Sequence, residues 1–214
     1  AYLPSYGVAS VRKATTTNTL PNSEYFDSWS LFSNVILTAG QTSPDNNTNA
    51  YKLIPNTVNT VHSLKQYTVT GQTFSITAKK GEYKNILLWN DLNSKGLGVN
   101  LDDNSIFRNV GVLHYNITEL TDDWKRIDVT LDTSFTGTAA LYIYDNSTPP
   151  NIAFAGNDSD GLFIYAAQLE EQTQAETYAP TFGLPVTIDL FTENNYGTMI
   201  NMTAGDIVPD TPNN

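Results

Sequence analysis

Residues 161–182 read GLFIYAAQLEEQTQAETYAPTF, and this stretch decides the fold class. Apolar side chains alternate along its first part, with Leu162, Ile164 and Ala166 falling on one side of an extended chain. The neighbouring residues Phe163, Tyr165 and Ala167 fall on the other side. A period of two over this length predicts a β-strand with one face toward a core.

The same stretch also contains the end of that strand. Glu170 and Glu171 follow the apolar run, and we interpret them as solvated or interface charges. A Tyr-x-Pro-Thr corner, Tyr178 to Thr181, comes next. Proline cannot continue a hydrogen-bonded strand, so the corner predicts a turn. Together these features indicate the closing strand of an antiparallel sandwich.

Composition narrows the classes of partner. The chain has 214 residues, no cysteine and a formal net charge of -11. Nucleic acids and anionic membranes are bound through basic surfaces, so we expect binding to neither. No run in the sequence approaches the roughly 18 apolar residues of a membrane span, so we expect no membrane insertion. Polyanionic glycans are disfavoured for the same reason, unless a local basic patch or a bound cation intervenes. The absence of cysteine excludes disulfides and thiolate chemistry, and it fits assembly in a bacterial cytoplasm.

Short apolar runs separated by Gly, Asn, Asp and Pro turns follow one another along the chain, without a convincing helix. This spacing predicts an all-β sandwich or barrel. We divide the chain into an N-terminal arm (1–20), a sandwich (21–182) and a C-terminal extension or linker (183–214). The extension contains possible final strands at 183–191 and 197–202.

Several segments, in order, resemble the jelly-roll carbohydrate-binding-like modules of bacteriophage tail-fibre and other virion structural proteins. Those modules are similar to the β-sandwich carbohydrate-binding modules of polysaccharide-degrading enzymes. The segments are NSEYFDSW (22–29), TSPDNNTNAYKL (42–53), FSITAKKG (74–81), DWKR (123–126) and the closing stretch from Ile164 to Thr181.

The resemblance implies a jelly-roll of two antiparallel sheets. It also implies a virion-surface protein whose partners are other virion proteins or identical subunits, as a trimer or ring, and host-surface glycan. Because such modules bind diverse ligands, the resemblance does not name a sugar. It assigns Trp29 and Trp124 to packing.

Sugar binding needs flat aromatic faces and planar polar groups. Trp89 is the best platform, since it lies on a predicted strand beside Asn90 and Asp91. Alternation places Tyr83 on the face of Trp89, and Tyr142 and Tyr144 alternate on another strand. The alternative is that these aromatic residues pack the sandwich core, as alternating aromatics commonly do.

Metal binding has a weaker signal. Related sandwich modules hold a structural Ca²⁺ near the opening strand, and Glu24, Asp27 and Gln168 occupy candidate positions. The loop 157–161 (NDSDG) is another candidate, although its Asp and Asn side chains also suit a self-bonded turn. His62 and His114 lack metal-ligand spacing, and we expect them to be hydrogen-bonded strand or surface residues.

No catalytic arrangement is apparent. Glu170-Glu171 and Asp122-Asp123 are adjacent pairs, and neighbouring strand residues point to opposite faces, so neither pair alone makes a glycosidase dyad. We therefore expect a non-enzymatic virion structural protein. The alternatives are a carbohydrate-binding module of a secreted polysaccharide-degrading enzyme and an architectural domain without a ligand.

Overall fold

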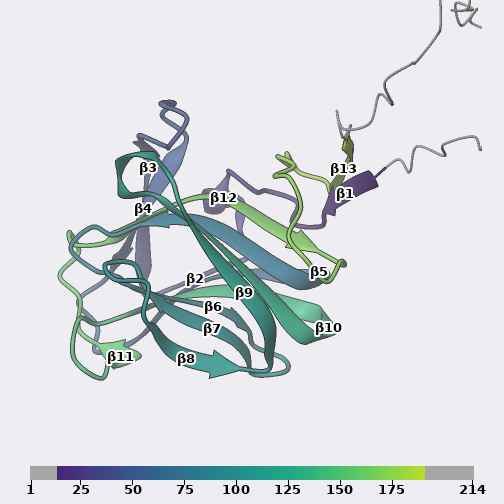
Figure 1. Cartoon of the computed structure of the whole chain (residues 1–214). Helices are drawn as coiled ribbons and strands as arrows, with labels where there is room; N and C mark the ends of the chain where they lie inside the picture. Colours follow the sequence, from purple (N-terminus) through teal and green to yellow (C-terminus); the bar gives the residue numbers. More distant parts are fainter. Residues whose placement is uncertain (1–13, 191–214) are drawn as a thin grey trace, which may run out of the picture.

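The computed structural model describes residues 14–190, which form antiparallel strands and two short 3-10 turns. Most strands pack as a sandwich, while a small two-stranded sheet stands beside it (Figure 1). Within residues 14–190, no helix has the length and apolar character needed to cross a bilayer. The predicted all-β antiparallel sandwich is confirmed; the jelly-roll order of connections stays a prediction.

The elements follow one another with short connections. They are β1 (Ala14–Asn18), η1 (Phe26–Ser28), β2 (Leu31–Ser33), β3 (Val35–Gln41), β4 (Ala50–Pro55), β5 (Thr60–Lys79), β6 (Asn85–Asn90), β7 (Lys95–Asn100), β8 (Ile106–Val110), β9 (Val112–Glu119), η2 (Thr121–Asp123), β10 (Lys125–Tyr144), β11 (Ala153–Phe154), β12 (Leu162–Glu170) and β13 (Val186–Leu190).

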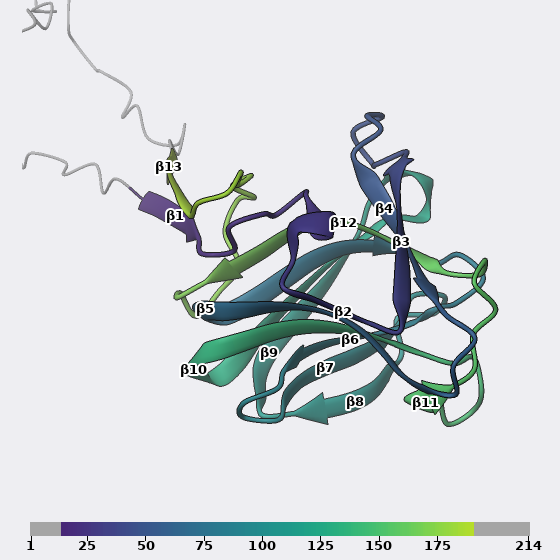
Figure 2. The same cartoon turned by 180° about the vertical axis from the view of Figure 1, so that it is seen from behind.

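Two long strands, β5 and β10, belong to both layers of the sandwich (Figures 1 and 2). The second half of β5 and the first half of β10 lie in a first layer with β3, β4, β12 and β9. Their other halves lie in a second layer with β2, β11, β6, β7 and β8. The sequence predicts a separate strand for each half; register shifts inside the β5–β10 pair instead let each strand continue from one layer to the other.

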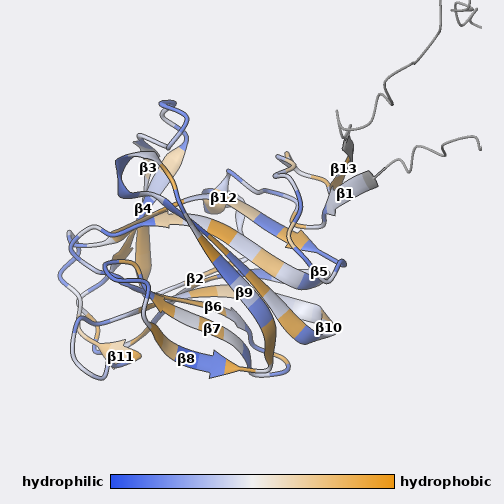
Figure 3. Ribbon diagram, viewed as in Figure 1, coloured by the Kyte–Doolittle hydropathy of each residue, from blue (hydrophilic) through white to orange (hydrophobic). Residues whose placement is uncertain are grey.

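The core lies between the layers. Phe74, Ile76 and Ala78 of β5 point inward, as their alternation predicts, and meet Leu88 of β6 and Val99 of β7 in one buried cluster. Orange and blue bands alternate along β5, β9 and β10 in Figure 3, as expected for strands with one apolar face. Trp29 is 3% exposed inside this cluster, and Trp124 is 2% exposed in a smaller one, which confirms both as packing residues.

The closing strand β12 departs from strict alternation. Leu162 and Ile164 face the core, but Ala166 has a φ of 51° and turns outward. The register against β5 shifts between Tyr165 and Gln168, so Ala167 replaces Ala166 on the core side. The predicted face of Ala166 and Ala167 is therefore wrong, because a bulge inserts one extra residue and reverses the alternation.

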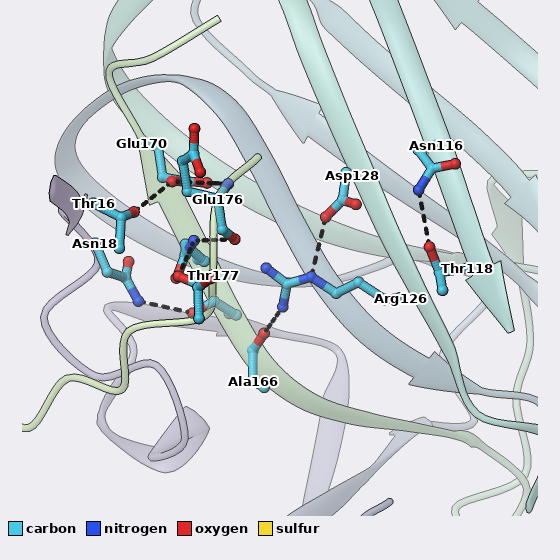
Figure 4. A network of polar contacts seen from close by, with 12 residues as sticks. Thr16, Asn18, Asn116, Thr118, Arg126, Asp128, Ala166, Glu170, Glu176 and Thr177 are labelled. Atoms are coloured by element: carbon cyan, nitrogen blue, oxygen red, sulfur yellow. Dashed lines mark hydrogen bonds and ion pairs between the residues drawn. The ribbon is translucent and has the colours of Figure 1, made fainter. Parts of the chain in front are cut away.

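Polar side chains cover the outer face of the first layer around this bulge (Figure 4). Arg126 of β10 donates from Nη1 to the Ala166 carbonyl oxygen at 2.7 Å and from Nε to Asp128 at 3.0 Å. Glu170 is fully buried and accepts a hydrogen bond from Thr16 at 2.7 Å, so its interpretation as a solvated charge is wrong. Glu171 is exposed, as predicted.

The Tyr-x-Pro-Thr corner joins the two ends of the sandwich. Thr181 Oγ1 donates to the Leu20 carbonyl oxygen at 2.6 Å and accepts from the Ser23 amide at 2.9 Å. The Tyr178 hydroxyl lies 2.7 Å from the Ser23 hydroxyl and 3.0 Å from Glu24 Oε1. The opening segment is thereby fastened to the closing one.

The predicted arm and extension meet beside this corner. Strand β1 of the arm pairs antiparallel with β13 of the extension, which confirms a strand within 183–191. In both views these strands stand side by side at one end of the sandwich (Figures 1 and 2). Residues 1–13 of the arm and 191–214 of the extension, including the possible strand at 197–202, lie outside the described residues.

Candidate carbohydrate-binding groove

The candidate site lies on the outer face of the second layer. In the β6–β10 pair, Trp89 stands opposite Ala140 and Leu87 stands opposite Tyr142. Successive residues of a strand face opposite sides of the sheet. Leu88 therefore points into the core, whereas Leu87 and Trp89 point to the outer face. With Ala140 and Tyr144, these side chains form an apolar cluster separate from the main core.

The neighbouring strand β7 presents glycine to this face. A Cβ on Gly98 would lie 2.5 Å from the Phe107 ring, and one on Gly96 would lie 2.8 Å from the Trp89 ring. The absence of both side chains therefore lets the two rings lie against the backbone of β7. In the next strand, Gly98 pairs with Arg108 and Val99 with Ile106, so Phe107 is an extra, bulged residue.

A groove of about 210 Å³ opens on this face. Its lining comes from strands β5, β6, β8 and β10 and from the loop before β11. The lining residues are Val61, Leu87, Trp89, Arg108, Tyr142, Tyr144 and Ile152. Three aromatic rings and one guanidinium thus surround a single hollow.

An ion pair stands beside this hollow. Asp91 accepts a hydrogen bond from the Tyr142 hydroxyl at 2.5 Å and one from Lys65 Nζ at 2.7 Å. Burial, and then the hydrogen bond to Asp91, raise the pKa of Tyr142 to about 12. Burial lowers the pKa of Lys65, but the bonds to Asp91 and Tyr142 outweigh it and leave that pKa raised. Tyr142 and Lys65 therefore remain protonated at neutral pH and hold the Asp91 carboxylate.

Arg108 and Tyr144 also line the groove. The Arg108 guanidinium carbon lies 4.5 Å from the centre of the Trp89 ring, within the range of a cation–π contact. The Tyr144 ring contacts Phe107 at 4.9 Å between centroids. Burial raises the pKa of Tyr144, while the nearby charge of Arg108 opposes that shift. The Tyr144 hydroxyl is buried and has no hydrogen-bond partner within residues 14–190.

The structure brings together some of the predicted sugar-binding residues. Trp89 and Tyr144 line the groove, and Asp91 holds the hydroxyl of Tyr142, which lines it too. Asn90 points elsewhere: its Oδ1 accepts from the amides of Leu92 and Asn93 and so shapes the β6–β7 turn.

Tyr83 is not part of the groove. It precedes β6 and packs against the main core, with its ring 5.3 Å from that of Phe154. The prediction that Tyr83 shares the face of Trp89 is wrong, because the strand begins only at Asn85 and its alternation does not extend back to residue 83. Arg108 and Phe107 were missed. The sequence feature that could have indicated them is the KGLGV run of residues 95–99. Its two alternate glycines leave one face of β7 open to rings from the neighbouring strands.

The predicted calcium ligands do not form a cluster of acidic side chains. Gln168 is fully buried, and its Oε1 accepts from the Ala179 amide at 2.7 Å. Glu24 accepts from Asn49 and Tyr178. Within the described part of the chain, no three His, Cys, Asp or Glu side chains are placed to hold a metal ion.

In the loop 157–161, Asn157 Oδ1 accepts from the Ser159 and Asp160 amides, as expected for a self-bonded turn. The bound Ca²⁺ stays a prediction.

Both histidines lie on strands. His62 is fully buried, with Nδ1 and Nε2 at 2.6 and 2.8 Å from the carbonyl oxygens of Asn34 and Phe154. This confirms it as a hydrogen-bonded strand residue. His114 is exposed on β9.

A second hollow of about 210 Å³ lies on the first layer. Gln41, Thr42, Lys79, Trp124 and Phe163 line it. Trp124 is almost fully buried, so Phe163 presents the more accessible of the two rings. The groove beside Trp89 combines more aromatic faces with a buried hydroxyl that has no hydrogen-bond partner among residues 14–190, and it is the better candidate for ligand binding.

Comparison of the sequence with protein-family models gave no match, and a search of curated proteins gave no match either.

Proposed function

We propose that this chain is a non-enzymatic glycan-binding domain and that the groove beside Trp89 holds the sugar. The observation that carries the proposal is the gathering of Trp89, Tyr142 and Tyr144 around one hollow, with a cation and a free hydroxyl among them. Aromatic faces match the apolar faces of sugar rings, and a few convergent polar groups orient the hydroxyls.

The groove size sets the mode of binding. Its 210 Å³ is below the roughly 300–1,000 Å³ of pockets that enclose drug-sized ligands. A single sugar unit held in this way binds weakly by itself. Several copies on one particle compensate, since linked sites raise the overall affinity by about 10²–10⁴-fold. This argument supports the setting that the resemblance implies, a virion tail-fibre or capsid-decorating protein attached to host-surface glycan.

The alternative setting, a binding module of a polysaccharide-degrading enzyme, uses the same groove. The two settings differ in assembly. The virion protein is expected to form a trimer or ring in light scattering and to be encoded beside capsid and tail genes. A module of an enzyme is expected to be monomeric and to be encoded with a glycosidase domain.

A glycan array tests the binding itself. Tyr144→Ala removes a ring from the groove, while Tyr83→Ala removes a partly buried tyrosine that packs away from it. We expect binding by the wild type and by Tyr83→Ala, and its loss in Tyr144→Ala and Trp89→Ala, with thermal melting showing that each variant folds. Absence of array binding, or retention by both groove variants, would overturn the proposal.

A further inference from the structure

The groove carries positive charge, although the chain as a whole is negative. This difference indicates which class of sugar the groove binds. The inference rests on the function proposed above. Two cations, Lys65 and Arg108, stand at a groove in a chain of net charge -11. Asp91 already neutralises Lys65 at 2.7 Å. Arg108 forms no ion pair with the residues of the described region. One positive charge therefore remains available at the groove.

A buried donor accompanies this charge. Tyr144 is 5% exposed and lines the groove, yet its hydroxyl lacks a hydrogen-bond partner in residues 14–190. Buried polar groups are almost always paired, and an unpaired one marks a place where a ligand or a water completes the bonding. Burial raises the pKa of Tyr144; the Arg108 guanidinium lowers it through its charge and through a contact with the hydroxyl, and that contact falls outside strict hydrogen-bonding geometry.

Arg108 also restricts how a neutral sugar could bind. Its guanidinium lies over the Trp89 ring at 4.5 Å, and Trp89 is 9% exposed. A neutral pyranose stacking on that ring would have to displace the cation and break the contact. An acidic sugar does not face this cost, because its anionic group can approach the guanidinium where it already lies.

We propose that the groove selects a sugar that carries a carboxylate, with one carboxylate oxygen accepting from Arg108 and the other from the Tyr144 hydroxyl. The planar guanidinium fork matches a carboxylate, and charge-assisted bonds of this kind are roughly twice as strong as neutral ones. The high negative charge of the chain opposes a long polyanion, so the preferred ligand is short or has isolated acidic units.

Two matched ligand pairs test this selection by isothermal titration. Trigalacturonate is compared with its methyl ester, and sialyllactose with lactose, so that each pair differs chiefly in the carboxylate or the residue bearing it. A sulfated galactose oligomer distinguishes a carboxylate preference from attraction of any anion. Arg108→Gln removes the charge, Arg108→Lys keeps it without the fork, and Tyr144→Phe removes only the hydroxyl. Lys84→Gln, at a half-exposed lysine near Asp102 rather than at the groove, controls for net charge.

We expect the wild type to bind an acidic member at least about 10-fold more tightly than its neutral partner, as charge-assisted bonds predict. Arg108→Gln should abolish this preference, Arg108→Lys should retain part of it, and Tyr144→Phe should weaken acidic binding about threefold or more. Lys84→Gln should behave as the wild type does.

Equal binding of neutral and acidic ligands that still needs Trp89 would overturn the acidic selection and leave the proposed function standing. A preference for acidic sugars that survives Arg108→Gln would also overturn the acidic selection and leave the proposed function standing. Tighter binding of the sulfated oligomer than of the carboxylate sugars would do the same. Absence of all glycan binding overturns both proposals.

Discussion

Arg126 donates a 2.7 Å hydrogen bond to the carbonyl oxygen of Ala166, the residue of the closing strand that adopts a positive φ. A bulge takes backbone groups out of the strand ladder, so they need another partner. Arg126 of β10 supplies one from the same layer, across β5, while its guanidinium lies 5.7 Å from the centre of the Tyr178 ring. One side chain thus supports both the bulge and the corner that follows it.

Arg126→Met tests this support. The substitution keeps an unbranched stem over Tyr178 but removes every N–H donor, which leaves the Ala166 carbonyl without its partner. We expect a loss of about 2 kcal/mol in the free energy of unfolding, measured by urea denaturation, since bonds to charged groups contribute about 1.5–3 kcal/mol. Lys84→Met is the matched control at a half-exposed lysine that lies 3.8 Å from Asp102, and it should change stability by less than about 0.5 kcal/mol. Equal effects of the two substitutions would contradict the role of Arg126.

Much of the sandwich follows from the sequence because long parts of its strands alternate regularly. Phe74, Ile76 and Ala78 face the core as the period of two requires. The face of Ala166 could not be predicted, since a bulge depends on pairing with a strand distant in sequence and left no local signal around an alanine. The continuity of β5 and β10 was missed for a related reason: Gly71 resembles a turn residue but lies within β5, where Leu169 packs against it.

The groove was predicted in part. Trp89 and Tyr144 were found because both lie on strands with clear alternation. Arg108 was not found, because its position over Trp89 depends on the bulge at Phe107 and on the register of β7 against β8. Tyr83 was misplaced, because the start of a strand is set by pairing partners rather than by the alternation itself. Tertiary pairing thus decided each of these positions.

Thr181 provides the second prediction. Its hydroxyl donates to the Leu20 carbonyl and accepts from the Ser23 amide, and all three residues are buried. Thr181→Val keeps the shape and leaves both backbone groups unpaired, at about 1–3 kcal/mol for each group. We expect a total loss of about 2–6 kcal/mol by urea denaturation. Thr181→Ser keeps the hydroxyl and should lose less than about 1 kcal/mol. A valine variant as stable as the serine variant would show that the corner does not fasten the opening segment.

Tyr142 provides a prediction on pH. Burial and the bond to Asp91 raise its pKa to about 12, above the value near 10 of an unfolded tyrosine. Because the folded pKa is raised, the stabilisation by Tyr142 is complete below pH ~10 and is lost as the pH rises toward 12. Tyr142→Phe cannot ionise, so its free energy of unfolding should fall less than that of the wild type between pH 10 and pH 12. Urea denaturation at several pH values measures both. Parallel curves for the two proteins would contradict the raised pKa.

The glycines of β7 provide the last prediction, which separates stability from binding. A Cβ on Gly96 would collide with the backbone oxygen of Leu88 in the paired strand, whereas the atoms nearest to one on Gly98 belong to the ring of Phe107. Backbone in a ladder cannot move away, but a half-buried ring can rotate. We therefore expect Gly96→Ala to cost about 3 kcal/mol and Gly98→Ala about 1 kcal/mol in urea denaturation.

Gly98→Ala should still weaken glycan binding, since moving Phe107 disturbs its contact with Tyr144 at 4.9 Å. Gly137→Ala, whose added Cβ would come no closer than 3.3 Å to Leu92, should leave both quantities nearly unchanged. If Gly98→Ala binds glycan as the wild type does, the ring of Phe107 does not position the groove.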